Sequence, residues 1–538
     1  MRNSAAACRQ CRVGKRRCNR PVREACLPCL KRQLDCSSAV KQSSTAILRP
    51  SSASIHKLND VHHLLTQPSY SDSLLQNISR EAVIDAVELY IRYLQDKPHS
   101  IFHVPTLRQS VRSGSIDQAL LLSILAMSGR FSDLESIRSR TSLFADQAKR
   151  LLKADLETVS LVRVQSWLLV GCHCDAEGKS TSASLFYGIA MRIAQISKLS
   201  EADPSDDAVL QETKSRVWWS LYMIDTWSAA GLATPRQMGE RSLSQQLPLD
   251  EYGFHSLDID QRIWPQPVKL GLWAYMIELA ELFGPIQDLN RSLVVSDLYD
   301  PSVASQVSKL AHSLEEWQQK LPEEMWLNAE TLAFHHRCGQ GRTLVALHLG
   351  YFHYTTLLLF QFLDWSSECL PYAETYAKRC LDHASAYSDL LRTSYDYGDC
   401  ETVWPIVGHM TVVSSSVLIH TLLFGAEESL SAAKARLESN FKVLMRLKTW
   451  WPSIGKMTDR LFLFQNACLR SGGHHTHKVD RWMVKFLLAH AITLGDKTEI
   501  DLLESTSPQS LDSSDSPELH RLSQRGHLTR DALSGLRI

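Results

Sequence analysis

The sequence predicts a small cysteine-rich module followed by a large all-α domain. Three observations support this fold class. Six cysteines lie within residues 8–36 of the 538-residue chain, apolar residues recur at helical spacing from about residue 80 onward, and no long strand-like alternation interrupts that pattern. With 44% hydrophobic and 22% charged residues, the composition is that of an ordinary globular protein.

Charge is distributed unevenly along the chain. Residues 1–50 contain twelve lysines or arginines and two acidic residues, which leaves 46 basic and 56 acidic residues for the remainder, although the formal net charge is zero. A basic head on an acidic body predicts a polyanionic partner for the head alone. We find no apolar signal segment before the cysteines and no run of about eighteen apolar residues. We therefore expect a reducing compartment and no membrane partner.

The six cysteines repeat one half-unit twice, a CxxC pair followed by a third cysteine. Each CxxC pair can chelate an ion through a tight turn, as in structural zinc sites. Three thiolates leave each tetrahedral zinc one ligand short, and the count closes when two ions share two bridging thiolates. So small a module cannot bury a sufficient core by itself, so its folding should depend on two Zn²⁺. The predicted ligands are Cys8, Cys11, Cys18, Cys26, Cys29 and Cys36.

Basic residues occupy the turns between these cysteines. Such a module binds a phosphate backbone with steep salt dependence. A short helix that presents Lys15 can donate to guanine O6 and N7 in a major groove. The alternative is a solvated basic face that reads no bases. The candidate DNA-binding residues are Arg12, Lys15, Arg16, Arg17, Lys31 and Arg32.

The stretch CRQCRVGKRRC, with CLPCLKRQLDC after it, resembles the fungal binuclear zinc cluster transcription factors of the Zn(2)-C(6) type. The resemblance implies that all six cysteines bind zinc, with Cys8 and Cys26 as bridging ligands. It also implies that Lys15 contacts a CGG-type triplet in double-stranded DNA. Family members often have Arg or Lys where this chain has Gly14, so the half-site preference stays open. Backbone contacts or supports would come from Arg12, Arg17 and Lys31.

Residues 37–79 are rich in serine and predict a linker. Ile55, Leu58, His62 and Leu65 follow coiled-coil spacing, but His62 would occupy a core position. The run also ends at Pro68 and is shorter than the three or four heptads of a stable coiled coil. The sequence therefore leaves monomer and homodimer open.

Residues 80–490 predict a helical domain. Segments such as AVELYIRYLQDKPHSIFHVPTL and ETKSRVWWSLYMIDTWSAAGLATPRQM resemble the fungal-specific transcription factor, or middle homology, domain. The resemblance implies a regulatory domain that restrains or licenses activation, in some members by binding a small-molecule effector. Two sets of residues are expected to form apolar helix faces: Val83, Val87, Tyr90, Ile91 and Leu94, and then Phe186, Ile189, Ile193 and Ile196.

Two features of the body each have both a structural and a chemical interpretation. The sequence CHC at 172–174 has the composition of a metal site, but adjacent residues do not converge easily on one ion. An aromatic-rich helix is predicted to belong to the core, with a ligand pocket as the alternative. Its aromatic residues are Trp218, Trp219, Tyr222 and Trp227.

Residues 491–538 predict an acidic, disordered tail. Seven acidic residues and one lysine lie between residues 495 and 519, with leucines among them. This composition is typical of activation segments that bind transcriptional coactivators, and a plain disordered tail is the alternative.

Together these features predict a nuclear, sequence-specific DNA-binding transcription factor for RNA polymerase II. We expect an activator, and by resemblance a metabolic gene cluster, including secondary metabolism, as its target. The alternatives are a repressor with the same head and a helical enzyme with a zinc appendage. No phosphate-binding or nucleophile motif is evident, so we do not expect an enzyme.

Overall fold

A computed structural model describes the body of the protein. The described residues all belong to the compact unit Val61–Ile538. They are 75, 77–232, 234–239, 245–258, 261–262, 268–295, 301–363, 372–471, 481–488 and 517–534. The predicted zinc module at 8–36 and most of the predicted linker lie outside them.

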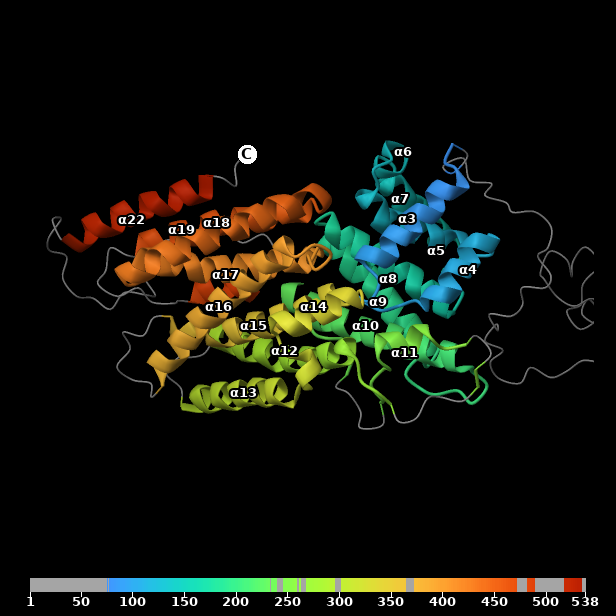
Figure 1. The fold of residues 1–538 in the computed structure, drawn as a ribbon, viewed down its shortest axis with the longest axis horizontal. Helices are drawn as coiled ribbons and strands as arrows, with labels where there is room; N and C mark the ends of the chain where they lie inside the picture. Colours follow the sequence, from blue (N-terminus) through green and yellow to red (C-terminus); the bar gives the residue numbers. More distant parts are fainter. Residues whose placement is uncertain are drawn as a thin grey trace, which may run out of the picture. The chain divides into compact units, whose positions relative to one another are not determined.

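A first group of helices packs around α5, at the right of Figure 1. Helix α5 is buried from Ala119 to Ser128 and contacts α3, α7 and α8. Its sequence QALLLSILAMS is apolar on all sides because other helices surround it. The group consists of α3 (Arg80–Tyr93), α4 (Val104–Ser113), α5 (Gln118–Ser128), η3 (Gly129–Phe131), α6 (Glu135–Arg138), α7 (Thr141–Ala154), α8 (Leu161–Ala176) and α9 (Ser180–Ile196).

A second group joins this first group to the rest of the body. Helix α10 contacts α8 and α9 on one side and α12 on the other, and α12 in turn contacts α13 and α15. The group consists of α10 (Ala208–Leu232), α11 (Glu251–His255), α12 (Leu272–Val295), α13 (Pro301–Lys320), η4 (Glu323–Met325), α14 (Ala329–Arg337), α15 (Gly341–Leu359) and η5 (Phe360–Phe362).

The third group is built on α17, which contacts α16, α18, α19 and α22 (Figure 1). Pro405 begins α17 at a position where a missing backbone N–H costs nothing. The group consists of α16 (Ala373–Asp396), α17 (Pro405–Phe424), α18 (Glu427–Trp450), α19 (Ser453–Ser471), α20 (Arg481–Leu488) and α22 (Pro517–Ser534).

Two helical stretches are long and apolar enough to cross a membrane by length and composition. They are Gly341–Phe362 and Pro405–Phe424, and 83% and 89% of their apolar windows are buried inside the body. Helices with this burial are apolar because they form the core of the bundle.

The prediction of an all-α body is confirmed for the described residues, in which an isolated β-bridge between Gln95 and His99 is the one strand-like pairing. On the predicted face of α3 and its C-cap, Val83, Val87, Tyr90 and Leu94 are buried and Ile91 is partly buried. On α9 the prediction was wrong at Ile196, which is 55% exposed. The last turn of α9 instead buries Ile193 and Ala194, because the helix ends at Ile196.

The prediction of a disordered tail was wrong for residues 517–534, which form α22. Helix α22 packs on α17, α18 and α19. Buried Arg525 donates to the carbonyl oxygens of Leu423 and Gly425 at the end of α17, and Gln465 donates to Thr529 at 2.9 Å. A cation is favourable at a helix C-terminus, which explains why the segment docks there. The acidic stretch 489–516 lies outside the described residues.

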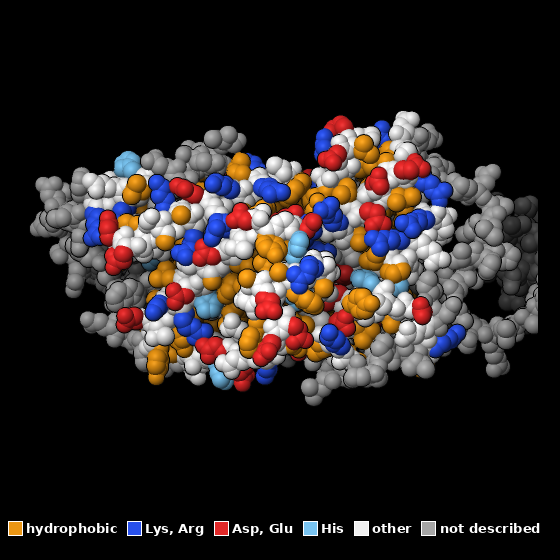
Figure 2. Space-filling model, viewed as in Figure 1, with side chains coloured by type: hydrophobic (Ala, Val, Ile, Leu, Met, Phe, Trp, Pro, Cys, Tyr) orange, Lys and Arg blue, Asp and Glu red, His pale blue; other side chains and the backbone are white. Residues whose placement is uncertain are grey.

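On the face drawn in Figure 2, lysine and arginine side chains are interspersed with aspartate and glutamate side chains. Apolar side chains lie between them, mostly in small groups. Mixed charge of this kind is typical of a solvated protein surface.

Candidate functional site

The predicted zinc and DNA-binding residues all lie outside the described residues, so their geometry stays a prediction. They are Cys8, Cys11, Cys18, Cys26, Cys29 and Cys36, together with Arg12, Lys15, Arg16, Arg17, Lys31 and Arg32. The candidate site that the structure does describe is a cavity in the helical body.

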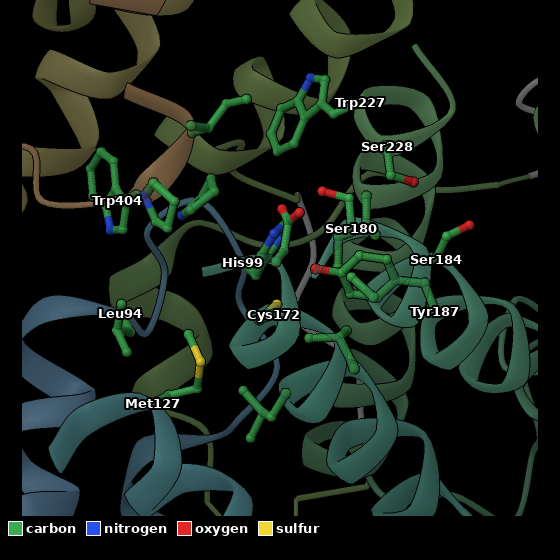
Figure 3. A pocket seen from close by; sticks show the side chains of 18 of the residues that line it. Leu94, His99, Met127, Cys172, Ser180, Ser184, Tyr187, Trp227, Ser228 and Trp404 are labelled. Carbon is green, nitrogen blue, oxygen red and sulfur yellow. The ribbon is translucent and has the colours of Figure 1, made fainter. Parts of the chain in front are cut away.

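The cavity lies where the first group of helices meets α10 and the start of α17. Its volume is about 130 Å³. Figure 3 shows its wall, with Cys172 from α8, Tyr187 from α9, Trp227 from α10 and Trp404 just before α17. Most of the lining is apolar or aromatic. Polar groups come from Lys97, His99, Asp175, Ser180, Ser184 and Ser228.

The segment between α3 and α4 carries Lys97, Pro98 and His99 to the cavity. Hydrogen bonds from several helices hold this segment in place. The Nε2 of Gln95 donates to the carbonyl oxygen of Phe102 at 3.0 Å, and the indole Nε1 of Trp273 donates to the carbonyl oxygen of Pro98 at 2.6 Å. The position of this wall is therefore set by α12 as well as by α3.

A buried ion cluster lies behind the same segment, and we call it the Arg216 cluster. Arg216 on α10 has a fully buried side chain and donates through Nε to Glu212, which is also fully buried, at 2.7 Å. Its other nitrogens donate to the carbonyl oxygen of Leu249 at 2.6 Å and to the hydroxyl of Ser100 at 2.7 Å. The ring of Phe254 lies 4.3 Å from the guanidinium carbon. Every N–H edge of this buried cation therefore has a partner nearby.

Asp96 extends the cluster toward the cavity segment. Its Oδ2 lies 2.8 Å from Nε2 of His255, and the hydroxyl of Ser100 donates to its Oδ1 at 2.5 Å. Burial acts to raise the pKa of Asp96, but His255, Arg216 and Lys97 outweigh burial and lower that pKa far below its usual value. Asp96 is therefore a carboxylate, and it fixes the loop that precedes His99.

The polar groups of the cavity wall titrate abnormally because protein surrounds them. Burial lowers the pKa of Lys97 to about 8, against the attraction of Asp96, and lowers the pKa of His99 to about 3. Burial also raises the pKa of Asp175 to about 6. The Nδ1 of His99 is buried and has no hydrogen-bond partner among the residues that the structure describes. Asp175 is nevertheless an exposed residue of the cavity wall, so solvent reaches its carboxylate and moderates this rise in pKa.

The CHC triplet at 172–174 does not converge on one point. Cys172 lines the cavity and hydrogen-bonds the hydroxyl of Tyr187. His173 lies 3.1 Å from Nη2 of Arg130, on the side of α5. Cys174 is buried in the core. Within the described part of the chain, no three potential ligands gather around a metal position.

Glycine at position 171 lets α8 and α9 approach closely at the cavity. A Cβ there would overlap the ring of Tyr187. The α8–α9 contact is among the most extensive in the body, and it places Tyr187 against Cys172 in the cavity wall. No local sequence signal marks this glycine, because the ring that requires it lies on another helix.

The aromatic residues of helix α10 are split between the two predicted roles, which are packing in the core and lining a ligand pocket. Trp219 is buried at 1% exposure and donates to the carbonyl oxygen of Gln246 at 3.2 Å, so it belongs to the core. Trp227 lines the cavity, and its Nε1 donates to the hydroxyl of Tyr354 at 2.8 Å. The two tryptophans lie eight positions apart along α10 and therefore meet different neighbours. Trp218 and Tyr222 are half-buried and pack against the core.

Comparison with known proteins was made for the whole chain. Residues 87–321, from within α3 to just beyond α13, match the model of the fungal specific transcription factor domain. This range contains every part of the cavity wall except the short stretch before and at the start of α17.

Several curated proteins are similar over most of the chain. A Zn(2)-C6 fungal-type transcription factor, FTF1a of Fusarium oxysporum f. sp. lycopersici, is 22% identical over 71% of this chain and 39% of its own length. Two uncharacterized transcriptional regulatory proteins of Schizosaccharomyces pombe are 23% and 20% identical. Those two matches cover 52% and 78% of this chain and 32% and 57% of the relatives. The chain thus matches between about a third and three fifths of the length of these relatives. Residues 87–321 thus match the fungal specific transcription factor domain, and the chain is similar to these transcriptional regulators over much of its length.

Proposed function

We propose that this transcription regulator acts in the nucleus and binds specific DNA sequences through a two-zinc module at residues 8–36. The observation that carries the proposal is the six-cysteine, arginine- and lysine-rich pattern that precedes a fungal specific transcription factor domain. Two of the relatives above are named as transcriptional regulatory proteins and another as a Zn(2)-C6 factor. Each half of this proposal, metal and DNA, can be tested separately.

The donor set of the module fits zinc. Six thiolates in two CxxC pairs with two further cysteines match the sulfur ligands and short spacings of structural zinc sites. Bound zinc supplies the folding free energy that so short a segment lacks. In our proposal Cys8 and Cys26 bridge the two ions, and the other four cysteines each bind one ion.

In this proposal the basic residues of the module bind DNA. Lys15 is the base-reading residue, directed at guanine in a CGG-like triplet. The remaining basic residues hold phosphates and set the register without reading sequence. They are Arg12, Arg16, Arg17, Lys31 and Arg32.

The helical body regulates this activity, and we propose activation as its outcome. Six of the seven acidic residues counted in the tail precede α22, and Glu518 lies within it. The proposed coactivator-binding segment is therefore the acidic stretch before α22. A repressor with the same head is the alternative, and tethering residues 489–538 to a reporter promoter separates the two. We also propose that the target is a metabolic gene cluster and that the protein binds DNA as a homodimer. A small-molecule effector is proposed to act on the helical body.

The first experiment selects randomised duplex DNA on the zinc-loaded full chain. We expect enrichment of one or two CGG-like triplets, and a fixed spacing between two triplets would establish a dimer. Lys15→Ala should relax the triplet preference, whereas Arg20→Ala, outside the proposed contact set, should keep it. Absence of any enriched sequence, with two zinc ions per chain verified, would overturn sequence-specific binding.

A further inference from the structure

One charged group in the cavity wall lacks a partner. Within the described part of the chain, the carboxylate of Asp175 accepts no hydrogen bond and pairs with no cation, and burial is the sole influence on its pKa. Asp175 is an exposed residue of the cavity wall, so its carboxylate is solvated and open to a ligand. A carboxylate without a protein partner beside an apolar cavity attracts a ligand of opposite charge.

The cation in the same wall is already compensated. The Nζ of Lys97 donates to the carbonyl oxygen of Gln95 at 3.0 Å, and Asp96 and Glu251 attract its charge. Lys97 is not among the groups that influence the pKa of Asp175. Among the described residues, Lys97 therefore forms no ion pair with Asp175.

The aromatic residues of the wall present rings rather than donors. The Nε1 of Trp227 donates to Tyr354, and the Nε1 of Trp404 donates to the carbonyl oxygen of Tyr93 at 3.0 Å. The hydroxyl of Tyr187 hydrogen-bonds Cys172. With these polar ends engaged, the rings offer π-faces, which attract cations and pack well on apolar groups.

The size of the cavity limits the ligand. At about 130 Å³ it approaches the roughly 150 Å³ of a protein cavity known to hold one benzene ring. A ligand of this size has one ring or a short aliphatic body. Three serine hydroxyls, from Ser180, Ser184 and Ser228, line the cavity and can orient a small polar group (Figure 3).

We propose that the cavity binds a small organic amine, whose ammonium group pairs with Asp175 and whose apolar body packs between Trp227, Tyr187 and Trp404. The ligand would touch both the first group of helices and the start of α17, so it would strengthen the junction between them. This inference deepens the regulatory role proposed for the body. Binding of the amine is measured without DNA, so its failure and the failure of the DNA proposal are separate results.

The test is calorimetric titration of the full chain with phenethylamine at neutral pH. Phenethyl alcohol and phenylacetate serve as neutral and anionic probes of similar shape. We expect one phenethylamine per chain and at least tenfold weaker binding of the other two probes. Equal affinity for the amine and the alcohol, or no saturable binding of the amine, would overturn the proposal.

Two variants assign the binding to the cavity. Asp175→Asn keeps the shape and removes the charge, and it should weaken phenethylamine binding at least tenfold without changing phenethyl alcohol binding. Asp133→Asn makes the same chemical change at an exposed site outside the cavity and should leave both affinities unchanged. Ser228→Leu narrows the cavity without a charge change and should weaken both probes together. Unchanged amine binding in Asp175→Asn, with the fold verified by circular dichroism, would contradict the assignment.

Discussion

The Arg216 cluster and the cavity wall around Asp175 lie on either side of the segment 95–100, and they place charge in opposite surroundings, buried in the cluster and exposed at the wall. In the Arg216 cluster, the buried guanidinium has Glu212, Leu249 and Ser100 as partners. At the cavity wall, Asp175 is exposed and its carboxylate has no partner among the described residues. The partners of Arg216 hold the cluster in one geometry, although Oε2 of Glu212 has no hydrogen-bond partner among the described residues. The unpaired charge of Asp175 is instead open to a ligand.

The comparison predicts that the cluster is the costlier of the two regions to disturb. Arg216→Met leaves the buried carboxylate of Glu212 without its cation, and we expect a loss of about 3–5 kcal/mol in the free energy of unfolding. Urea unfolding followed by circular dichroism measures it. The matched control is Arg236→Met, because Arg236 pairs with Asp288 at the surface, where such pairs contribute at most about 1 kcal/mol. Equal losses in the two variants would show that the cluster is not structural.

A second prediction concerns the wall that holds Tyr187. Gly171→Ala places a methyl group against that ring and should lower the free energy of unfolding by about 1–3 kcal/mol. It should also weaken phenethylamine binding, because Tyr187 must move. At Gly239 a Cβ meets open space, so Gly239→Ala should change neither quantity. Thermal unfolding with and without the amine measures both effects. An unchanged free energy of unfolding in Gly171→Ala would show that α8 and α9 can move apart at little cost in stability.

A third prediction uses pH to probe the segment between the two regions. His99 has a pKa of about 3 in the folded protein and about 6.5 when unfolded, so the unfolded chain binds the extra proton between these values. His99 therefore contributes stability that is present above about pH 6.5 and is lost as pH falls toward 3, at about 1.4 kcal/mol per pH unit.

Replacing His99 by Leu should remove that contribution to the pH slope of the free energy of unfolding, measured by urea unfolding at pH 5 and pH 7. The exposed His312→Leu on α13 is the control, and its slope should stay close to that of the unaltered protein. Identical slopes for the His99 variant and the unaltered protein would mean that His99 is hydrated in the folded state.

The smallest expected effect is that of Asp175→Asn on the free energy of unfolding of the protein without ligand. The pKa of Asp175 is raised in the folded protein, so its contribution to stability is fully present below about pH 3.8 and is lost as pH rises through about 6. Asp175→Asn should therefore stabilise the free protein at pH 7, by less than about 1 kcal/mol because water in the cavity screens the charge. Differential scanning calorimetry measures the shift. A marked loss of stability would reveal a structural partner for Asp175 and would weaken the ligand proposal.

The sequence by itself determined the local chemistry of this protein. Periodicity predicted the helical body and the buried face of α3, because both depend on residues within a few turns of one another. The cysteine pattern predicted a metal module for the same reason, since CxxC chelation is local. The composition of the tail indicated disorder over 491–538, and it could not reveal α22, which is held by Leu423, Gly425 and Gln465 from distant helices.

Only the tertiary structure decided which residues meet at the cavity. Trp219 and Trp227 belong to the same aromatic-rich helix, yet one enters the core and the other lines a ligand-sized space, because α10 passes different neighbours along its length. Trp404 reaches the carbonyl oxygen of Tyr93, 311 residues earlier in the chain. Asp175 is one of 58 acidic residues in the sequence, and its lack of a partner is a property of the packing around it. Periodicity specifies which face of a helix is buried. The packing of the whole body specifies which residues that face contacts.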